Sequence, residues 1–214
     1  MARRSLLSAF IAFTIVANVL VFAPSSAAHE EVPRGKVAYT TALDGREVIF
    51  VFDPANTSDR RPLVDLGDRD ASEPAWSFDG ARIAFTAQMS PGGPTAIFVA
   101  DADATEMTQV TFPDTGESDS DASWSPQGDE IVFARTLASG LSRILVVDLG
   151  TLDLRALDSP SLPTATEPDW SPEGSRIAFV AKQSVDLTAC ESTPGACRWS
   201  LFITNEDGTG APQR

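Results

Sequence analysis

The sequence predicts an all-β protein, a β-propeller built from four-stranded antiparallel blades, and three repeated segments support that prediction. Each segment begins with Trp-Ser, passes through a glycine-containing turn and ends in a strand with alternating apolar residues. The segments begin at Trp76, Trp124 and Trp170, so the repeats are 48 and 46 residues long. A repeat of this length with strand-like residues is typical of propeller blades.

The residues of each segment explain its predicted shape. The prolines at 126 and 172 favour a turn, and the glycine that follows in each copy tolerates positive φ. The tryptophan ring is too large for one sheet to bury, so we expect stacked blades to bury it between them. Fixed-period similarity argues against the alternative, three unrelated hairpins in a sandwich. The predicted structural repeat residues are Trp76, Gly80, Trp124, Gly128, Trp170 and Gly174.

These segments resemble the WD40-like repeats of TolB-type β-propellers, whose consensus is Pro-x-Trp-Ser-Pro-Asp-Gly followed by an Ile-Ala-Phe strand. The similarity continues through residues 97–103 and 109–111, which resemble the third strand, acidic turn and closing strand of that repeat. It spans roughly residues 35–210, although Phe78 stands where the family has proline. The resemblance implies a six-bladed type of propeller and an extracytoplasmic interaction role.

The chain starts with a predicted secretory signal peptide, residues 1–28. Arg3 and Arg4 form its basic start, Leu6 to Phe22 its apolar run, and residues 26–28 a small-residue cleavage site. The expected location is therefore periplasmic or secreted, with no membrane span after cleavage. The long apolar run leaves an uncleaved N-terminal anchor as the alternative.

The predicted mature chain, residues 29–214, forms one partial propeller. We expect three strands in the first blade, four in each of the next two and three in the last. Such an open arc exposes the faces of its outermost blades, so we expect a piece of a longer protein or a chain that must associate. The predicted blades span residues 35–66, 72–112, 120–158 and 166–214.

The charge of the chain narrows the class of partner, and its two cysteines predict a disulfide. The formal net charge is −14, which argues against nucleic acid and allows a basic peptide or a cation as partner, with solubility as the simplest role of the charge. Cys190 and Cys197 lie in an insertion of the last blade. In an exported chain this pair predicts a disulfide, and nothing nearby completes a metal site.

The sequence gives little support for catalysis. His29 is the single histidine, and no Gly-x-Ser-x-Gly motif occurs, so no hydrolase triad can be assembled. We expect no enzyme activity, no cofactor and no metal. Two acidic runs, residues 101–106 and 117–121, lack the pattern of a calcium loop, and we predict solvated loops there.

The sharper candidate is an acid that recurs three residues before each tryptophan: Glu73, Asp121 and Glu167. Propeller geometry would place these acids on the innermost strands, near the channel rim. There they would form an arc for a basic side chain, a peptide terminus or a cation. The alternative is that each acid accepts backbone hydrogen bonds in its own loop.

The predicted function is that of an exported, non-catalytic propeller that binds or scaffolds a protein in the cell envelope or outside the cell. One alternative is the gating propeller of a prolyl-oligopeptidase-like enzyme that lacks its hydrolase domain. Another is a propeller that binds a carbohydrate or a cation.

Overall fold

The computed structural model describes residues 35–157, 162, 164–182, 199–209, 212 and 213. The predicted signal peptide and the predicted disulfide between Cys190 and Cys197 lie outside these residues. Within the described part, no helix has the length and apolarity needed to cross a membrane.

Fourteen β-strands make up the described secondary structure. They are β1 (Val37–Leu43), β2 (Arg46–Asp53), β3 (Asn56–Val64), β4 (Ala71–Trp76), β5 (Arg82–Gln88), β6 (Thr95–Asp101), β7 (Met107–Gln109), β8 (Ser118–Trp124), β9 (Glu130–Thr136), β10 (Ser142–Asp148), β11 (Leu154–Ala156), β12 (Thr164–Trp170), β13 (Arg176–Lys182) and β14 (Trp199–Asn205).

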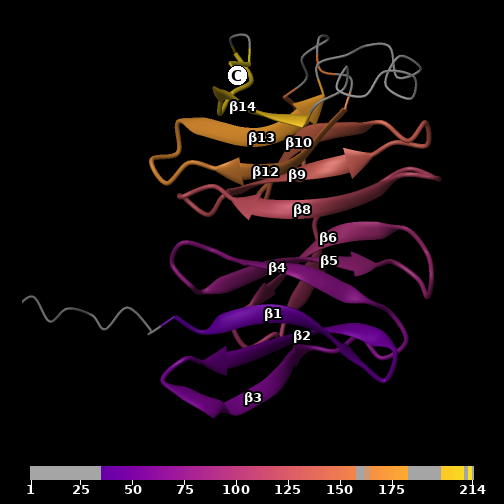
Figure 1. Ribbon diagram of the computed structural model, residues 1–214, viewed down its shortest axis with the longest axis vertical. Helices are drawn as coiled ribbons and strands as arrows, with labels where there is room; N and C mark the ends of the chain where they lie inside the picture. Colours follow the sequence, from indigo (N-terminus) through magenta and orange to yellow (C-terminus); the bar gives the residue numbers. More distant parts are fainter. Residues whose placement is uncertain (1–34, 158–161, 163, 183–198, 210–211, 214) are drawn as a thin grey trace, which may run out of the picture. The chain divides into compact units, whose positions relative to one another are not determined.

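The strands form four antiparallel sheets, each from consecutive strands, which we call blades 1 to 4. Blade 1 has the order β1-β2-β3, blade 2 β4-β5-β6-β7, blade 3 β8-β9-β10-β11 and blade 4 β12-β13-β14. Successive blades are in contact through their inner strands, as Figure 1 shows. In the described residues the strand counts of the blades are as predicted. Residues 206–208 form a turn after β14, and Gln213 pairs with Ile203 through both backbone hydrogen bonds.

The Trp-Ser motif builds the same turn in three blades. The serine hydroxyl after each tryptophan accepts a hydrogen bond from the backbone amide five residues later, and the serine carbonyl accepts one from the glycine amide. Each of those glycines has positive φ, as the sequence predicts. The equivalent serines are Ser77, Ser125 and Ser171.

The hydrophobic core consists of three clusters, each formed between neighbouring blades. Trp124 is 2% exposed and packs with Ala84 and Ile97 of blade 2, which confirms that its ring is buried between blades. Its indole N–H donates to the Ala75 carbonyl at 2.9 Å, and the Arg82 guanidinium lies 4.6 Å from the ring centre. The repeat thus places each tryptophan at an interface with the preceding blade.

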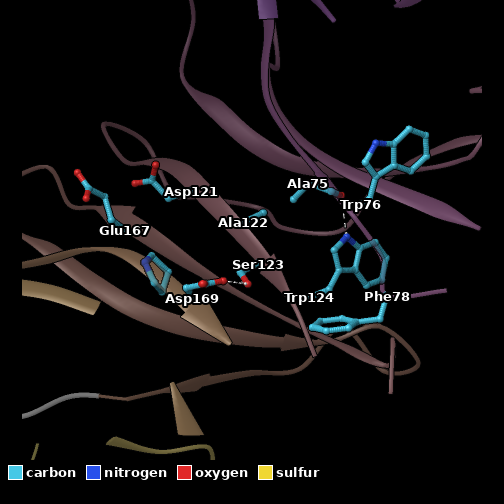
Figure 2. Close-up of a pocket in the computed structure, with 10 residues that line it drawn as sticks. Ala75, Trp76, Phe78, Asp121, Ala122, Ser123, Trp124, Glu167 and Asp169 are labelled. Carbon is cyan, nitrogen blue, oxygen red and sulfur yellow. Dashed lines mark hydrogen bonds between the residues drawn. The ribbon is translucent and has the colours of Figure 1, made fainter. Parts of the chain in front are cut away.

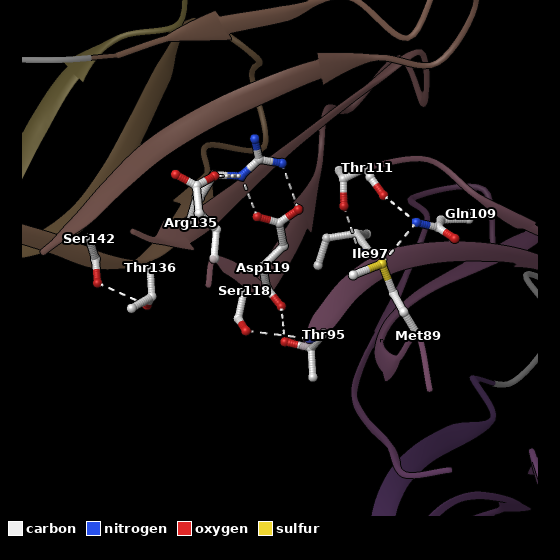
Figure 3. A network of polar contacts seen from close by, with 11 residues as sticks. Met89, Thr95, Ile97, Gln109, Thr111, Ser118, Asp119, Arg135, Thr136 and Ser142 are labelled. Atoms are coloured by element: carbon white, nitrogen blue, oxygen red, sulfur yellow. Dashed lines mark hydrogen bonds and ion pairs between the residues drawn. The ribbon is translucent and has the colours of Figure 1, made fainter. Parts of the chain in front are cut away.

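One predicted loop is wrong: residues 118–121 belong to β8, and Asp119 is fully buried there. Its carboxylate accepts two hydrogen bonds from Arg135, at 2.6 and 2.8 Å, in the network of Figure 3. Neighbouring Thr95 of blade 2 donates its hydroxyl to the Asp119 carbonyl at 2.8 Å. The buried guanidinium compensates the carboxylate's loss of water, and the sequence pattern does not reveal that partner.

The other acidic run does form a surface turn. Asp101 ends β6, and its carboxylate accepts hydrogen bonds from the Thr105 hydroxyl at 2.6 Å and the Glu106 amide at 2.9 Å. These bonds favour the ionised form and lower the pKa of Asp101. The acid therefore closes its own turn.

Candidate functional site

The three recurring acids occupy the same backbone position in three blades. Glu73, Asp121 and Glu167 lie at β-bulges of the inner strands, where the pairing register shifts, and have φ of 52°, 57° and 52°. Positive φ in a residue other than glycine costs about 1–3 kcal/mol and persists only where the surroundings enforce it. The bulge is therefore a structural part of the repeat, a feature that the sequence analysis did not identify.

Hydrogen bonds connect the bulges of neighbouring blades. The Glu73 carboxylate accepts one bond from the Asp121 amide at 3.1 Å and another from the Thr86 hydroxyl at 2.7 Å. At the junction with blade 1, the Glu73 amide donates to the Thr40 hydroxyl at 3.1 Å. The bond between Asp121 and Glu73 thus joins blades 2 and 3, whereas the alternative expectation confined such bonds to the acid's own loop.

Asp121, the middle acid of the three, has a shifted pKa. Burial raises the pKa of Asp121 above its ordinary value, and the negative charges of Glu73 and then Glu167 add to that effect. Hydrogen bonds from Ser120 and from the Glu167 backbone act in the opposite direction. A positively charged group beside Asp121 would offset both the burial and the repulsion.

Two of the acids line a cavity of about 450 Å³ over the inner strands of blades 2 to 4, here called the inner-strand groove. Figure 2 shows Asp121 and Glu167 towards one end and the aromatic residues towards the other. Glu73 does not line the groove, although it contacts Asp121. The lining residues are Ala75, Trp76, Phe78, Asp121, Ala122, Ser123, Trp124, Glu167, Pro168 and Asp169.

The middle of the groove is polar. The Ser123 hydroxyl donates to the Asp169 carboxylate at 2.9 Å and accepts a bond from the Trp170 amide at 3.1 Å. These bonds join blades 3 and 4 and hold a third carboxylate on the groove wall. Asp169 stands one residue before its tryptophan, and no sequence pattern singled it out.

The other end of the groove is aromatic. Phe78 is 56% exposed and occupies the turn position where the other repeats have proline. Trp76 is half-buried, and its indole nitrogen is buried without a hydrogen-bond partner. The departure of Phe78 from the repeat was the sequence signal for this end of the groove, but it was interpreted only as a difference from the family pattern.

The two ends of the groove differ in chemistry. Carboxylates at one end and aromatic rings at the other suit a ligand that joins a basic group to an apolar one. In residues 35–157, 162, 164–182, 199–209, 212 and 213, no three His, Cys, Asp or Glu side chains are grouped to hold a metal ion. His29 lies outside the described residues.

Comparisons with known proteins agree with the fold. The family model described as the TolB beta propeller domain (PD40) matches residues 17–206, whereas no curated protein matches the chain. TolB from Acinetobacter baumannii is 19% identical with a TM-score of 0.64, over 84% of this chain and 41% of TolB. A candidate TolB from Agrobacterium tumefaciens is 18% identical with a TM-score of 0.66, over 82% of this chain and 59% of that protein.

A peptidase also shares the fold. The puromycin-hydrolyzing peptidase of Mycobacterium tuberculosis is 14% identical with a TM-score of 0.61, over 84% of this chain and 27% of the peptidase. At these identities the structural matches show the fold alone. This chain spans only part of each matched protein: 41% of the Acinetobacter TolB, 59% of the Agrobacterium protein and 27% of the peptidase. The repeats, the four blades and the family match together show that the chain belongs to the TolB beta-propeller domain (PD40) family.

Proposed function

We propose that this chain is an exported, non-catalytic propeller module that binds a protein partner through the inner-strand groove. The observation that supports the proposal is the composition of the groove, with Asp121 and Glu167 at one end and exposed Phe78 at the other. A partner segment with a lysine, an arginine or a free amino terminus next to an apolar side chain would meet both ends.

The surroundings of Asp121 also favour a cationic partner. Its carboxylate is partly desolvated and repelled by Glu73 and Glu167, so it gains more from a cationic partner than an exposed acid would. The long-range field has the same sign, because the chain's net charge of −14 attracts basic partners and speeds their encounter.

Export and the lack of catalysis belong to the same proposal. Export is supported by residues 1–28, with two arginines before an apolar run and a small-residue cleavage site. A binding role is favoured over hydrolysis because the sequence has one histidine and no nucleophile motif.

The test is photo-crosslinking in the cell envelope of the producing organism. Phe78→p-benzoylphenylalanine, a substitution of similar shape, should crosslink to a protein at this end of the groove. Phe112→p-benzoylphenylalanine is the matched control, because Phe112 is 62% exposed, close to the 56% of Phe78, but lies outside the groove.

The adduct should disappear when Asp121→Asn and Glu167→Gln are added, since both changes remove charge and keep shape. An adduct of equal yield from position 112, or one that survives the two changes, would overturn the groove as the binding surface. Loss of carbohydrate or cation binding in the same double variant, without any protein adduct, would favour the small-ligand alternative.

A further inference from the structure

The inner-strand groove has an unbalanced negative charge. Among the described residues, its lining includes the carboxylates of Asp121, Glu167 and Asp169 and no lysine, arginine or histidine. Asp121 lies in the middle blade of the three that carry a bulge acid, so Glu73 and Glu167 flank it from the two neighbouring blades. The groove therefore concentrates like charges around one carboxylate.

Hydrogen bonds hold the three bulge acids near one another. The Glu73 carboxylate accepts the Asp121 amide at 3.1 Å, and a backbone group of Glu167 donates to the Asp121 carboxylate. The Thr86 hydroxyl is a second donor to Glu73, at 2.7 Å. Because backbone groups make two of these contacts, the fold itself keeps the like charges together.

The strands that pack against β8 supply no counter-charge to Asp121. These strands are β4, β5, β6, β9 and β12, and their basic residues are Arg82 and Arg135. Arg82 lies against the Trp124 ring, and Arg135 donates to the Asp119 carboxylate at 2.6 Å. The acidic residues of these strands and of β8 are Glu73, Asp101, Asp119, Asp121, Glu130, Glu167 and Asp169.

We propose that the inner-strand groove exchanges a proton on Asp121 for the basic group of its partner, so that it binds the partner near neutral pH and releases it in acid. The inference rests on the proposed function, because it concerns the regulation of the same groove. A proton and a bound cation each relieve the repulsion between the neighbouring carboxylates, so they compete for Asp121.

The direction of the effect follows from the two states of the groove. Burial and the charges of Glu73 and Glu167 raise the pKa of Asp121 in the free groove. A bound cation lowers that pKa, because it favours the ionised carboxylate. The affinity should therefore be constant above the pKa of the free groove, decrease as the pH falls through it, and level off below the pKa of the complex. Each unit between these two pKa values changes the affinity about tenfold.

The experiment uses two dipeptide probes, acetyl-lysyl-phenylalanine amide and its uncharged analogue acetyl-norleucyl-phenylalanine amide. The NMR signals of the indole N–H groups of Trp76 and Trp124, which line the groove, give the dissociation constant of each probe at a series of pH values. The lysine of the probe stays charged between neutral and acidic pH, so it does not titrate itself. The affinity for the lysine probe should fall about tenfold or more towards acidic pH, and that for the norleucine probe should be low throughout.

Three variants assign the pH dependence to Asp121. Asp121→Asn keeps the shape without the charge, so at neutral pH it should bind the lysine probe as weakly as the wild type does in acid, without further pH dependence. Glu73→Gln lies outside the groove lining and removes one neighbouring charge, so it should move the midpoint of the pH dependence to lower pH. Phe78→Ala should weaken binding at every pH and leave the midpoint unchanged.

The outcomes separate this inference from the proposed function. Binding of the lysine probe that requires Phe78 but does not change with pH would overturn the proton exchange alone. A pH dependence that survives Asp121→Asn, or a midpoint that does not move in Glu73→Gln, would do the same. No binding at any pH would overturn the proposed function as well. Circular dichroism at each pH should show folded protein, and Glu73→Gln provides the test if Asp121→Asn does not fold.

Discussion

Blades 2 and 3 have the same strands, the same Trp-Ser turn and the same bulge, yet their equivalent residues have different surroundings. Trp124 is buried and its N–H donates to the Ala75 carbonyl on the inner strand of blade 2. Trp76 is half-buried, and its N–H has no acceptor among the described residues, where no inner strand precedes β1. The repeat therefore does not fix the acceptor of its indole N–H, because Trp170 also follows a blade with an inner strand and donates instead to the Gly174 carbonyl of its own turn, at 3.0 Å.

A second difference concerns one cross-strand pair. Blade 3 pairs Asp119 with Arg135, and at the same register blade 2 pairs Ala71 with Ala87. Blade 4 has Ala165 and Ala181 there. A buried ion pair thus replaces a small apolar pair in one blade of three, and the blade fold accommodates both. The fold itself does not require the charges.

The largest effect is expected from truncating the better packed tryptophan. Trp124→Ala should lower the free energy of unfolding by about 3–5 kcal/mol, because it removes a fully buried ring from an interface. Trp76→Ala should cost clearly less, because that ring is half-buried. Urea unfolding followed by circular dichroism measures both, and equal losses would remove the difference between the two interfaces.

Breaking the ion pair of blade 3 should also be costly. Arg135→Ala leaves the Asp119 carboxylate buried without a partner and should cost about 3 kcal/mol or more. The double variant Asp119→Ala with Arg135→Ala copies the alanine pair of blades 2 and 4 and should cost less than Arg135→Ala alone. Urea unfolding of both variants tests this, and a double variant less stable than the single one would contradict it.

A smaller effect isolates the indole hydrogen bond. Trp124→Phe and Trp76→Phe remove the same atoms, but only the first breaks a hydrogen bond, the one that the indole N–H donates to the Ala75 carbonyl. Trp124→Phe should therefore be about 1 kcal/mol more destabilising than Trp76→Phe. The measurement is the difference between the two unfolding free energies, and a difference of zero would mean that the bond contributes nothing.

The smallest effect is a dependence on pH. Because the pKa of Asp121 is raised in the folded chain, its contribution to stability is present at low pH. That contribution is lost as the pH rises from 3.8, the ordinary pKa of an aspartate, through the raised pKa of Asp121. Asp121→Asn should remove this loss. The stability of the variant relative to the wild type should therefore increase across this pH range and stay constant above it.

Asp148→Asn is the control of opposite sign. The amides of Thr151 and Gly150 lower the pKa of Asp148, so its stabilising contribution is present above 3.8 and is lost as the pH falls through the lowered value. The stability of Asp148→Asn relative to the wild type should therefore decrease as the pH rises. Thermal unfolding of the three proteins across acidic pH measures both trends, and parallel curves would refute them.

The sequence by itself determined the blade fold, the turn after each tryptophan and the burial of Trp124. These features depend on local rules that a repeat displays openly: glycine permits positive φ, alternation selects a strand face, and a fixed period implies stacked units. Local rules also located the recurring acids on the inner strands, because each stands at a constant distance from its tryptophan.

Only the tertiary structure decided how those residues are used. It placed Arg135 against Asp119, connected the Glu73 carboxylate to the Asp121 amide, and left Trp76 without the acceptor that Trp124 has. It also brought Phe78 to the same groove as Asp121. The physical reason is that each of these environments depends on a partner on another strand or in another blade. A hydrogen bond or ion pair between residues 16 or 48 positions apart leaves no periodic trace in the sequence.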